Sequence, residues 1–148
     1  DRSMLGGAQR CLSTQCGMIP LMYDCLYDQL SAADRLACED YLRREVVEPY
    51  LNFMLDAGRE PGFGQHLGIN IGWWEFYAWL WSLAAIYDPG DARQRRGLEL
   101  SAERIRLGLH MGADAAGVIG EGPGYASIKI FSWWSSAEVL RRLGVTDF

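Results

Sequence analysis

The chain has 148 residues and a formal net charge of −5 at pH 7, and it is 49% hydrophobic and 22% charged. This balance excludes a compositionally disordered protein, and the length is that of one domain, since domains most often have roughly 100–150 residues. The acidic charge argues against a nucleic-acid partner, which needs a basic surface. The most apolar stretch, residues 72–87, contains Glu75 and is too short to predict a membrane span. We therefore expect residues 1–148 to form a single domain.

The four cysteines lack the spacing of a metal site. Cys11, Cys16, Cys25 and Cys38 follow the pattern C-x4-C-x8-C-x12-C, which differs from the paired-cysteine patterns of structural zinc. We expect no metal and no cofactor. Buried free thiols are the favoured interpretation, and a disulfide such as Cys11–Cys16 stays open.

Helical periodicity dominates the sequence, and the alternation typical of strands is scarce. An apolar helical segment over residues 21–30 is expected to open at Pro20. Ser31 then caps a second helix, with Asp34 at its third position, and Pro49 ends or kinks that helix.

A third helix is expected over residues 69–87 and is apolar nearly all round, so other helices should enclose it. Asp88-Pro89-Gly90 forms a turn, and Asp91 caps an amphipathic helix over residues 92–111. A last helix begins near Pro123 and ends at Gly144. The apolar stripe of the amphipathic helix consists of Leu98, Ala102, Ile105 and Leu109.

The alternation of enclosed and surface helices predicts an all-α fold of stacked helical hairpins. Either a solenoid or a closed α/α toroid satisfies this pattern, and no repeat of fixed period decides between them.

Asn70 shares one sector of its helix with Trp73, Trp74, Tyr77 and Trp81. One interpretation is an amide that caps the helix or bonds a neighbouring loop. The other is a polar group at the mouth of an aromatic cleft on which sugar rings stack.

A second polar strip lies on the last helix, where Tyr125, Lys129, Ser132 and Ser136 fall within about 60° of one another. A lysine one turn after a tyrosine favours the phenolate, as a tyrosine acid or base requires, or it holds an anionic substrate. The alternative is a strip that faces bulk solvent.

Other candidate groups carry weaker signals. His66 precedes the aromatic helix and His110 ends the amphipathic helix; either is a candidate proton carrier, although a surface or loop position is the favoured interpretation for both. Glu121 brings a carboxylate to the start of the last helix. The spacing of the acidic residues singles out no carboxylate pair for glycoside hydrolysis; those considered are Asp24, Glu75, Asp88 and Glu121.

Three segments together resemble the heparinase II/III-like polysaccharide lyases. Residues 23–31, YDCLYDQLS, are similar to the family's tyrosine–aspartate segment. The stretch from Asn70 through Trp73 and Trp74 to the Asp-Pro-Gly turn resembles its catalytic-asparagine helix. Residues 120–125, GEGPGY, look like its EG-x-x-Y element. The order of the segments and the 55-residue interval from Asn70 to Tyr125 also fit, and the resemblance covers residues 20–144.

The resemblance implies part of an incomplete α/α toroid, a lyase that cleaves uronic-acid-containing glycans by β-elimination, and a periplasmic or secreted location. Asn70 would neutralise the uronate carboxylate and Tyr125 would move a proton. As an extension, we assign substrate binding to Trp73, Trp74, Lys129, Glu121 and His66.

Members of this family are several times longer and have a further histidine in a region that this chain lacks. The chain corresponds to about three helical hairpins, so we expect a fragment whose groove is completed by the rest of its toroid or by another subunit. The alternatives are a non-catalytic helical module that binds glycans or a protein, and an inverting glycosidase with two carboxylates.

Overall fold

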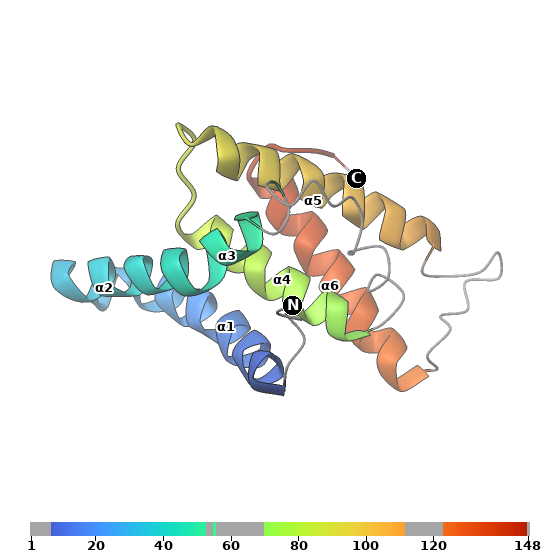
Figure 1. The fold of residues 1–148 in the computed structure, drawn as a ribbon, viewed down its shortest axis with the longest axis horizontal. Helices are drawn as coiled ribbons and strands as arrows, with labels where there is room; N and C mark the ends of the chain where they lie inside the picture. The colour runs from blue at the N-terminus through green and yellow to red at the C-terminus, as the bar shows by residue number, and fades with distance from the viewer. Residues whose placement is uncertain (1–6, 53–54, 56–69, 112–122, 148) are drawn as a thin grey trace.

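The computed structural model describes residues 7–52, 55, 70–111 and 123–147. Side chains are described for these ranges except at 7–16, 70–75, 111, 123–125, 128 and 129. All regular secondary structure in the described part of the chain is helical, which confirms the all-α prediction (Figure 1).

The first two helices form a hairpin. α1 spans Gly7–Leu26, a short 3-10 turn spans Tyr27–Gln29, and α2 spans Ala32–Leu42. The predicted cap is confirmed, because the backbone N–H of Asp34 donates to Ser31 Oγ at 3.2 Å. The prediction that Pro20 opens a helix is wrong: Pro20 lies inside α1. Its fixed φ suits a helix, and only one backbone hydrogen bond is lost.

Pro49 marks a change of helical geometry. The wide π-type turn η2, Arg43–Val47, follows α2 directly, and the short helix α3, Glu48–Leu51, has Pro49 in its first turn. A proline cannot donate the hydrogen bond to the residue four positions earlier. The wider turn accommodates this loss without ending the helical path.

The two central helices form the second hairpin. α4 spans Asn70–Ala85 and α5 spans Ala92–Met111. In the connecting turn, the N–H of Gly90 donates to Asp88 Oδ1 at 2.8 Å, and Asp91 Oδ1 accepts from the N–H of Arg93 at 2.8 Å. The predicted turn and the predicted cap are both confirmed.

α6 spans Pro123–Arg142 and ends as predicted at a glycine. Gly144 has φ of +69°, a conformation that side chains disfavour. The N–H of Val145 donates to the carbonyl of Leu140 at 3.0 Å, which closes the helix end.

The helices form two layers. α1, α4 and α6 run side by side in the same direction and make up the inner layer, with α4 in the middle (Figure 1). The outer layer consists of α2, η2, α3 and α5, and α5 runs back across α4 and α6. Between neighbouring parallel helices of the inner layer the chain returns through the outer layer: α2, η2 and α3 come between α1 and α4, and α5 comes between α4 and α6.

The core lies between the layers and centres on Trp79. Its ring stacks on Tyr50 of α3 with centroids 4.6 Å apart, and its Nε1–H donates to the carbonyl of Val47 at 3.3 Å. On α5, Leu98, Ala102 and Ile105 are buried as predicted. Leu109 is 46% exposed, contrary to the prediction, because α5 and α6 diverge toward that end (Figure 1).

The described residues also test the expectations about a membrane span and about the cysteines. No described helix is long and apolar enough to cross a membrane. Among the cysteines with described side chains, Cys25 is an exposed free thiol and Cys38 is a half-buried one. The expectation of burial is therefore wrong for Cys25, whose side chain is exposed one residue before the end of α1.

Candidate functional site

The predicted catalytic residues stand at the starts of two neighbouring helices. Asn70 is the first residue of α4 and Tyr125 is the third residue of α6. Trp73 and Trp74 lie in the first two turns of α4, and Lys129 lies in the second turn of α6. The backbone of these residues is described, but their side chains are outside the described part, as are the whole of His66 and Glu121.

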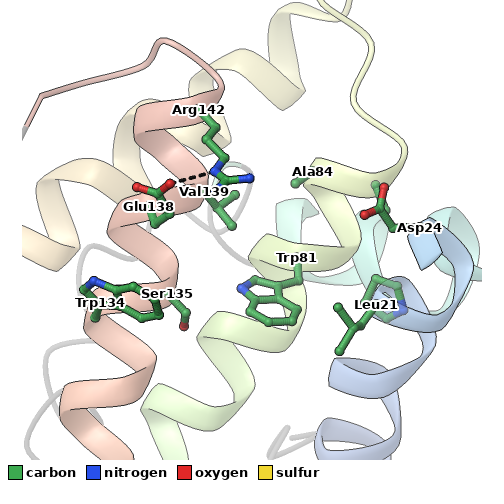
Figure 2. A pocket seen from close by; sticks show the side chains of 11 residues that line it. Leu21, Asp24, Trp81, Ala84, Trp134, Ser135, Glu138, Val139 and Arg142 are labelled. Atoms are coloured by element: carbon green, nitrogen blue, oxygen red, sulfur yellow. Dashed lines mark hydrogen bonds and ion pairs between the residues drawn. The ribbon is translucent and has the colours of Figure 1, made fainter.

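The register between α4 and α6 can be read from residues further along. Tyr77 and Phe131 make an edge-to-face contact with ring centroids 6.2 Å apart. Trp81 lies level with Ser135 (Figure 2). Both pairs are separated by 54 positions, and this constant separation is what two adjacent parallel helices require. Extended to the helix starts, this register puts Asn70 level with residues 124–125.

One face of α4 continues from Asn70 to the described aromatic residues. At 100° per residue, Tyr77 and Trp81 fall in the same sector as Asn70, while Trp79 points to the opposite side. Trp79 packs on the outer layer, so the sector of Asn70 belongs to the inner face, which we define as the side of α1, α4 and α6 away from the outer layer. Burial raises the pKa of Tyr77 on this face.

The polar strip of α6 does not face bulk solvent over its described part. Ser132 and Ser136 are both fully buried. The solvent-facing interpretation is therefore wrong for these two positions, because α6 is covered by α4 on one side and by α5 on the other. Small hydroxyl-bearing residues fit where helices approach closely. At 100° per residue, the positions of Tyr125 and Lys129 fall in the same sector of α6 as these two serines.

A groove crosses the inner layer near the carboxyl ends of its helices. It has a volume of about 330 Å³, and we call it the aromatic groove. Figure 2 shows Trp81 of α4 in its centre, Leu21 of α1 on one side and Trp134 of α6 on the other. Its complete lining consists of Pro20, Leu21, Asp24, Trp81, Ala84, Ala85, Trp134, Ser135, Glu138, Val139 and Arg142.

No described residue holds the indole of Trp81 by a hydrogen bond. Its Nε1–H is shielded from solvent and has no acceptor among the described residues. The ring of Trp134 is largely exposed, at 67%, at the edge of the same groove. Two indole faces of different exposure thus border one open space.

Charged groups stand along one rim of the aromatic groove. Glu138 accepts from Arg141 at 2.8 Å and from Arg142 Nε at 2.6 Å. These hydrogen bonds, that of Arg141 foremost, lower the pKa of Glu138 to about 2. Asp24 stands across α4 from Arg142 (Figure 2) and has no partner among the described residues.

The tyrosine–aspartate segment lies beside a second groove of about 460 Å³, between α1, α2 and the end of α4. Tyr23 is buried, and its hydroxyl donates to Glu39 Oε1 at 2.5 Å. Burial first, and this hydrogen bond next, raise the pKa of Tyr23. The guanidinium of Arg35 lies 4.3 Å from the ring centroid of Tyr27. These contacts hold the α1–α2 hairpin together and give the segment a structural role.

The other candidate residues whose side chains are described do not lie together in one site. His110 is exposed, as the surface interpretation predicted. Asp88 is bonded within its turn, and Asp24 is exposed on α1. No cluster of histidine, cysteine or acidic side chains that could hold a metal occurs in the described ranges. The side chain of Glu75 is not among those described.

Comparison of the chain with protein-family models, with curated proteins and with solved structures found no match.

Sequence reasoning did not bring together the residues around the aromatic groove. Trp81 was named on α4, and Asp24 was considered only as a carboxylate for glycoside hydrolysis. Trp134 and Arg142 were not among the predicted site residues, and both lie on α6. Phe131, Trp134 and Glu138 recur at intervals of three and four, which is the signal of one helix face. The partners of that face depend on the parallel register, which a single sequence does not show.

Proposed function

We propose that this chain is part of a polysaccharide lyase that cleaves uronic-acid-containing glycans by β-elimination. The observation that carries the proposal is the register of α4 and α6. Two adjacent parallel helices begin side by side, and Asn70 and Tyr125 stand level at those beginnings. An amide and a phenol from different helices can then act on one sugar.

The chemistry uses the two groups in different ways. The C5 proton of a uronate is weakly acidic while the adjacent carboxylate keeps its full charge. The Asn70 amide would donate a hydrogen bond to that carboxylate and stabilise the enolate-like transition state. Tyr125 would take the C5 proton or protonate O4. As the C5–H and C4–O4 bonds break, a C4–C5 double bond forms and O4 leaves with a proton.

The remaining assignments follow the same two helix starts. Trp73 and Trp74 would stack neighbouring sugars, and Lys129 would pair with a carboxylate or sulfate. Glu121 and His66 would complete the substrate-binding residues. The substrate is an acidic polysaccharide, and the location is periplasmic or secreted.

The layered arrangement supports part of an α/α toroid. An inner layer of parallel helices, with helices of an outer layer returning between them, is the arrangement that a toroid repeats around its axis. We propose that the rest of the toroid, or another subunit, completes the groove.

The test compares Asn70→Ala and Tyr125→Phe with matched controls at Asn52 and Tyr27, which are exposed and far from the helix starts. In the protein as it occurs naturally, uronate polymer should yield 4,5-unsaturated ends that absorb in the ultraviolet. Each catalytic variant should lose about 10²–10⁴-fold in rate, while Asn52→Ala and Tyr27→Phe keep it. Full activity in both catalytic variants contradicts the assignment.

The aromatic groove favours a second candidate, a helical module that binds glycans without cleaving them. Its indole faces and charged rim suit sugar rings, and they lie away from the helix starts. Calorimetric binding of acidic oligosaccharides with no unsaturated product would support this candidate. Hydrolysed reducing ends would instead favour a glycosidase.

A further inference from the structure

We infer that the aromatic groove is a second sugar-acid site, which binds one hexuronate unit through Trp81, Arg142 and Asp24. This inference rests on the proposed function only for the choice of the sugar. The site is distinct from the pair at the helix starts, because Trp81 follows Asn70 by about 16 Å along the axis of α4 at 1.5 Å per residue.

The guanidinium of Arg142 supplies the carboxylate-binding group. Its Nε is bonded to Glu138, and its two terminal nitrogens have no partner among the described residues. Glu138 is in turn shared with Arg141, so the carboxylate fixes the stem of Arg142 without using its outer edge. A free guanidinium edge matches a carboxylate by two parallel N–H···O bonds.

Asp24 supplies a hydrogen-bond acceptor for the hydroxyl groups of the ligand. Its carboxylate accepts hydrogen bonds but donates none, and no described residue donates to it. Figure 2 shows Asp24 and Arg142 on two sides of Ala84, over the same groove. A ligand that spans them needs an anionic group at one end and hydroxyl donors at the other. A hexuronate has both on one ring.

The two indoles supply the apolar surface between these groups. The lining of the groove is mostly apolar, and Trp81 and Trp134 offer ring faces to a pyranose. A rotation that offers the Trp81 Nε1–H to a ligand oxygen breaks no hydrogen bond to a described residue, since this donor has no acceptor among them. The volume of about 330 Å³ lies in the range of small-molecule sites, roughly 300–1,000 Å³.

The test follows the indole N–H resonances of the ¹⁵N-labelled protein during titration with D-glucuronate. This monosaccharide has no glycosidic bond to cleave, so turnover does not enter the measurement. The resonance that is absent in Trp81→Phe should shift, while that of Trp79, which is bonded within the core, should stay in place. Acetate and a neutral methyl glucoside serve as ligand controls.

Arg142→Gln should weaken glucuronate binding about tenfold or more, as expected for losing hydrogen bonds to a charged group. Arg141→Gln is the matched control, because Arg141 shares Glu138 but does not line the groove. The control variant should keep the shift of the Trp81 resonance and the affinity.

Three results would overturn the inference: an unmoved Trp81 resonance, an equal response to acetate or to the methyl glucoside, and equal weakening by both arginine variants. Any of them leaves the lyase proposal untouched, since that proposal depends on product formation by Asn70 and Tyr125. Conversely, a specific Trp81 shift with full activity in Asn70→Ala and Tyr125→Phe keeps the groove and rejects the lyase.

Discussion

Trp79 and Trp81 lie two positions apart on α4, yet one indole is held in the core and the other borders an open groove. Trp79 is 1% exposed, stacks on Tyr50 and donates to Val47. Trp81 is half-buried, and its N–H has no acceptor among the described residues. The outer side of α4 therefore packs the two layers together, whereas the inner side leaves an indole face half-exposed and its N–H without an acceptor among the described residues.

The largest expected effect comes from deleting the two indoles. Trp79→Ala should lower the free energy of unfolding by about 3–5 kcal/mol, because it leaves a cavity between the layers. Trp81→Ala should cost about 1–2 kcal/mol, since the ring is only half-buried and the groove beside it is already open. Urea denaturation measures both values. Equal losses would contradict the distinction between the two sides of α4.

A finer comparison removes only the indole N–H groups. Trp79→Phe should cost about 1–3 kcal/mol of stability, because it removes the hydrogen bond to Val47 and part of a packed ring. Trp81→Phe should change stability by less than about 1 kcal/mol, because the donor that it removes has no acceptor in the part of the chain that the structure describes. Thermal unfolding of the two variants at one pH measures both losses of stability. A larger loss in Trp81→Phe than in Trp79→Phe would contradict the expectation.

The tightness of the outer side can be tested at Gly97. A Cβ at this position would lie 2.6 Å from Leu51 Cδ2 and 3.4 Å from the ring of Trp79. Gly97→Ala should cost about 1 kcal/mol, because the crowding exceeds the gain in helix propensity. Adding Leu51→Val, which shortens the crowding side chain, should cost less than the sum of the two single changes. Strict additivity would show that the Cβ meets no crowding.

The smallest effect concerns the charged rim of the inner side. The pKa of Glu138 is lowered to about 2 from its usual 4.5, so its ion pairs stabilise the folded protein above pH 4.5. This contribution is lost as the pH falls from 4.5 toward 2. The difference in stability between the protein and Glu138→Gln should shrink over that interval, and added salt should reduce it at neutral pH. A pH-independent difference contradicts the assignment of the shift to Arg141 and Arg142.

The sequence predicted those parts of the fold that depend on neighbouring residues. The caps at Ser31 and Asp91 and the helix end at Gly144 were confirmed, because the donors and acceptors lie within five positions of one another. The burial of α4 was predicted from its composition and is confirmed for most of its described part. It is wrong for the inner side near the end of the helix, where Trp81, Ala84 and Ala85 border the aromatic groove.

The errors concern contacts between distant residues. Leu109 has the correct spacing for burial, but the divergence of α5 from α6 exposes it. Proline is typical of the first turn of a helix, so the sequence predicted a helix start at Pro20. Pro20 instead lies inside α1, where the helix continues with one backbone hydrogen bond missing. The aromatic groove needed the register of three helices, and no pattern within one helix specifies it. The pairing of Asn70 with Tyr125 remains a prediction, which the resemblance and its 55-residue interval suggested.

The common direction of α4 and α6 has an electrostatic consequence. Each helix start carries about +0.5 of an elementary charge from its aligned peptide dipoles, and the two starts stand side by side. The backbone thereby contributes close to one positive charge at one end of a molecule whose net charge is −5. Because this potential comes from peptide groups, it does not depend on a cationic side chain or on pH. It would offset, at that end, the repulsion between this acidic protein and the acidic polysaccharide that we propose as its substrate.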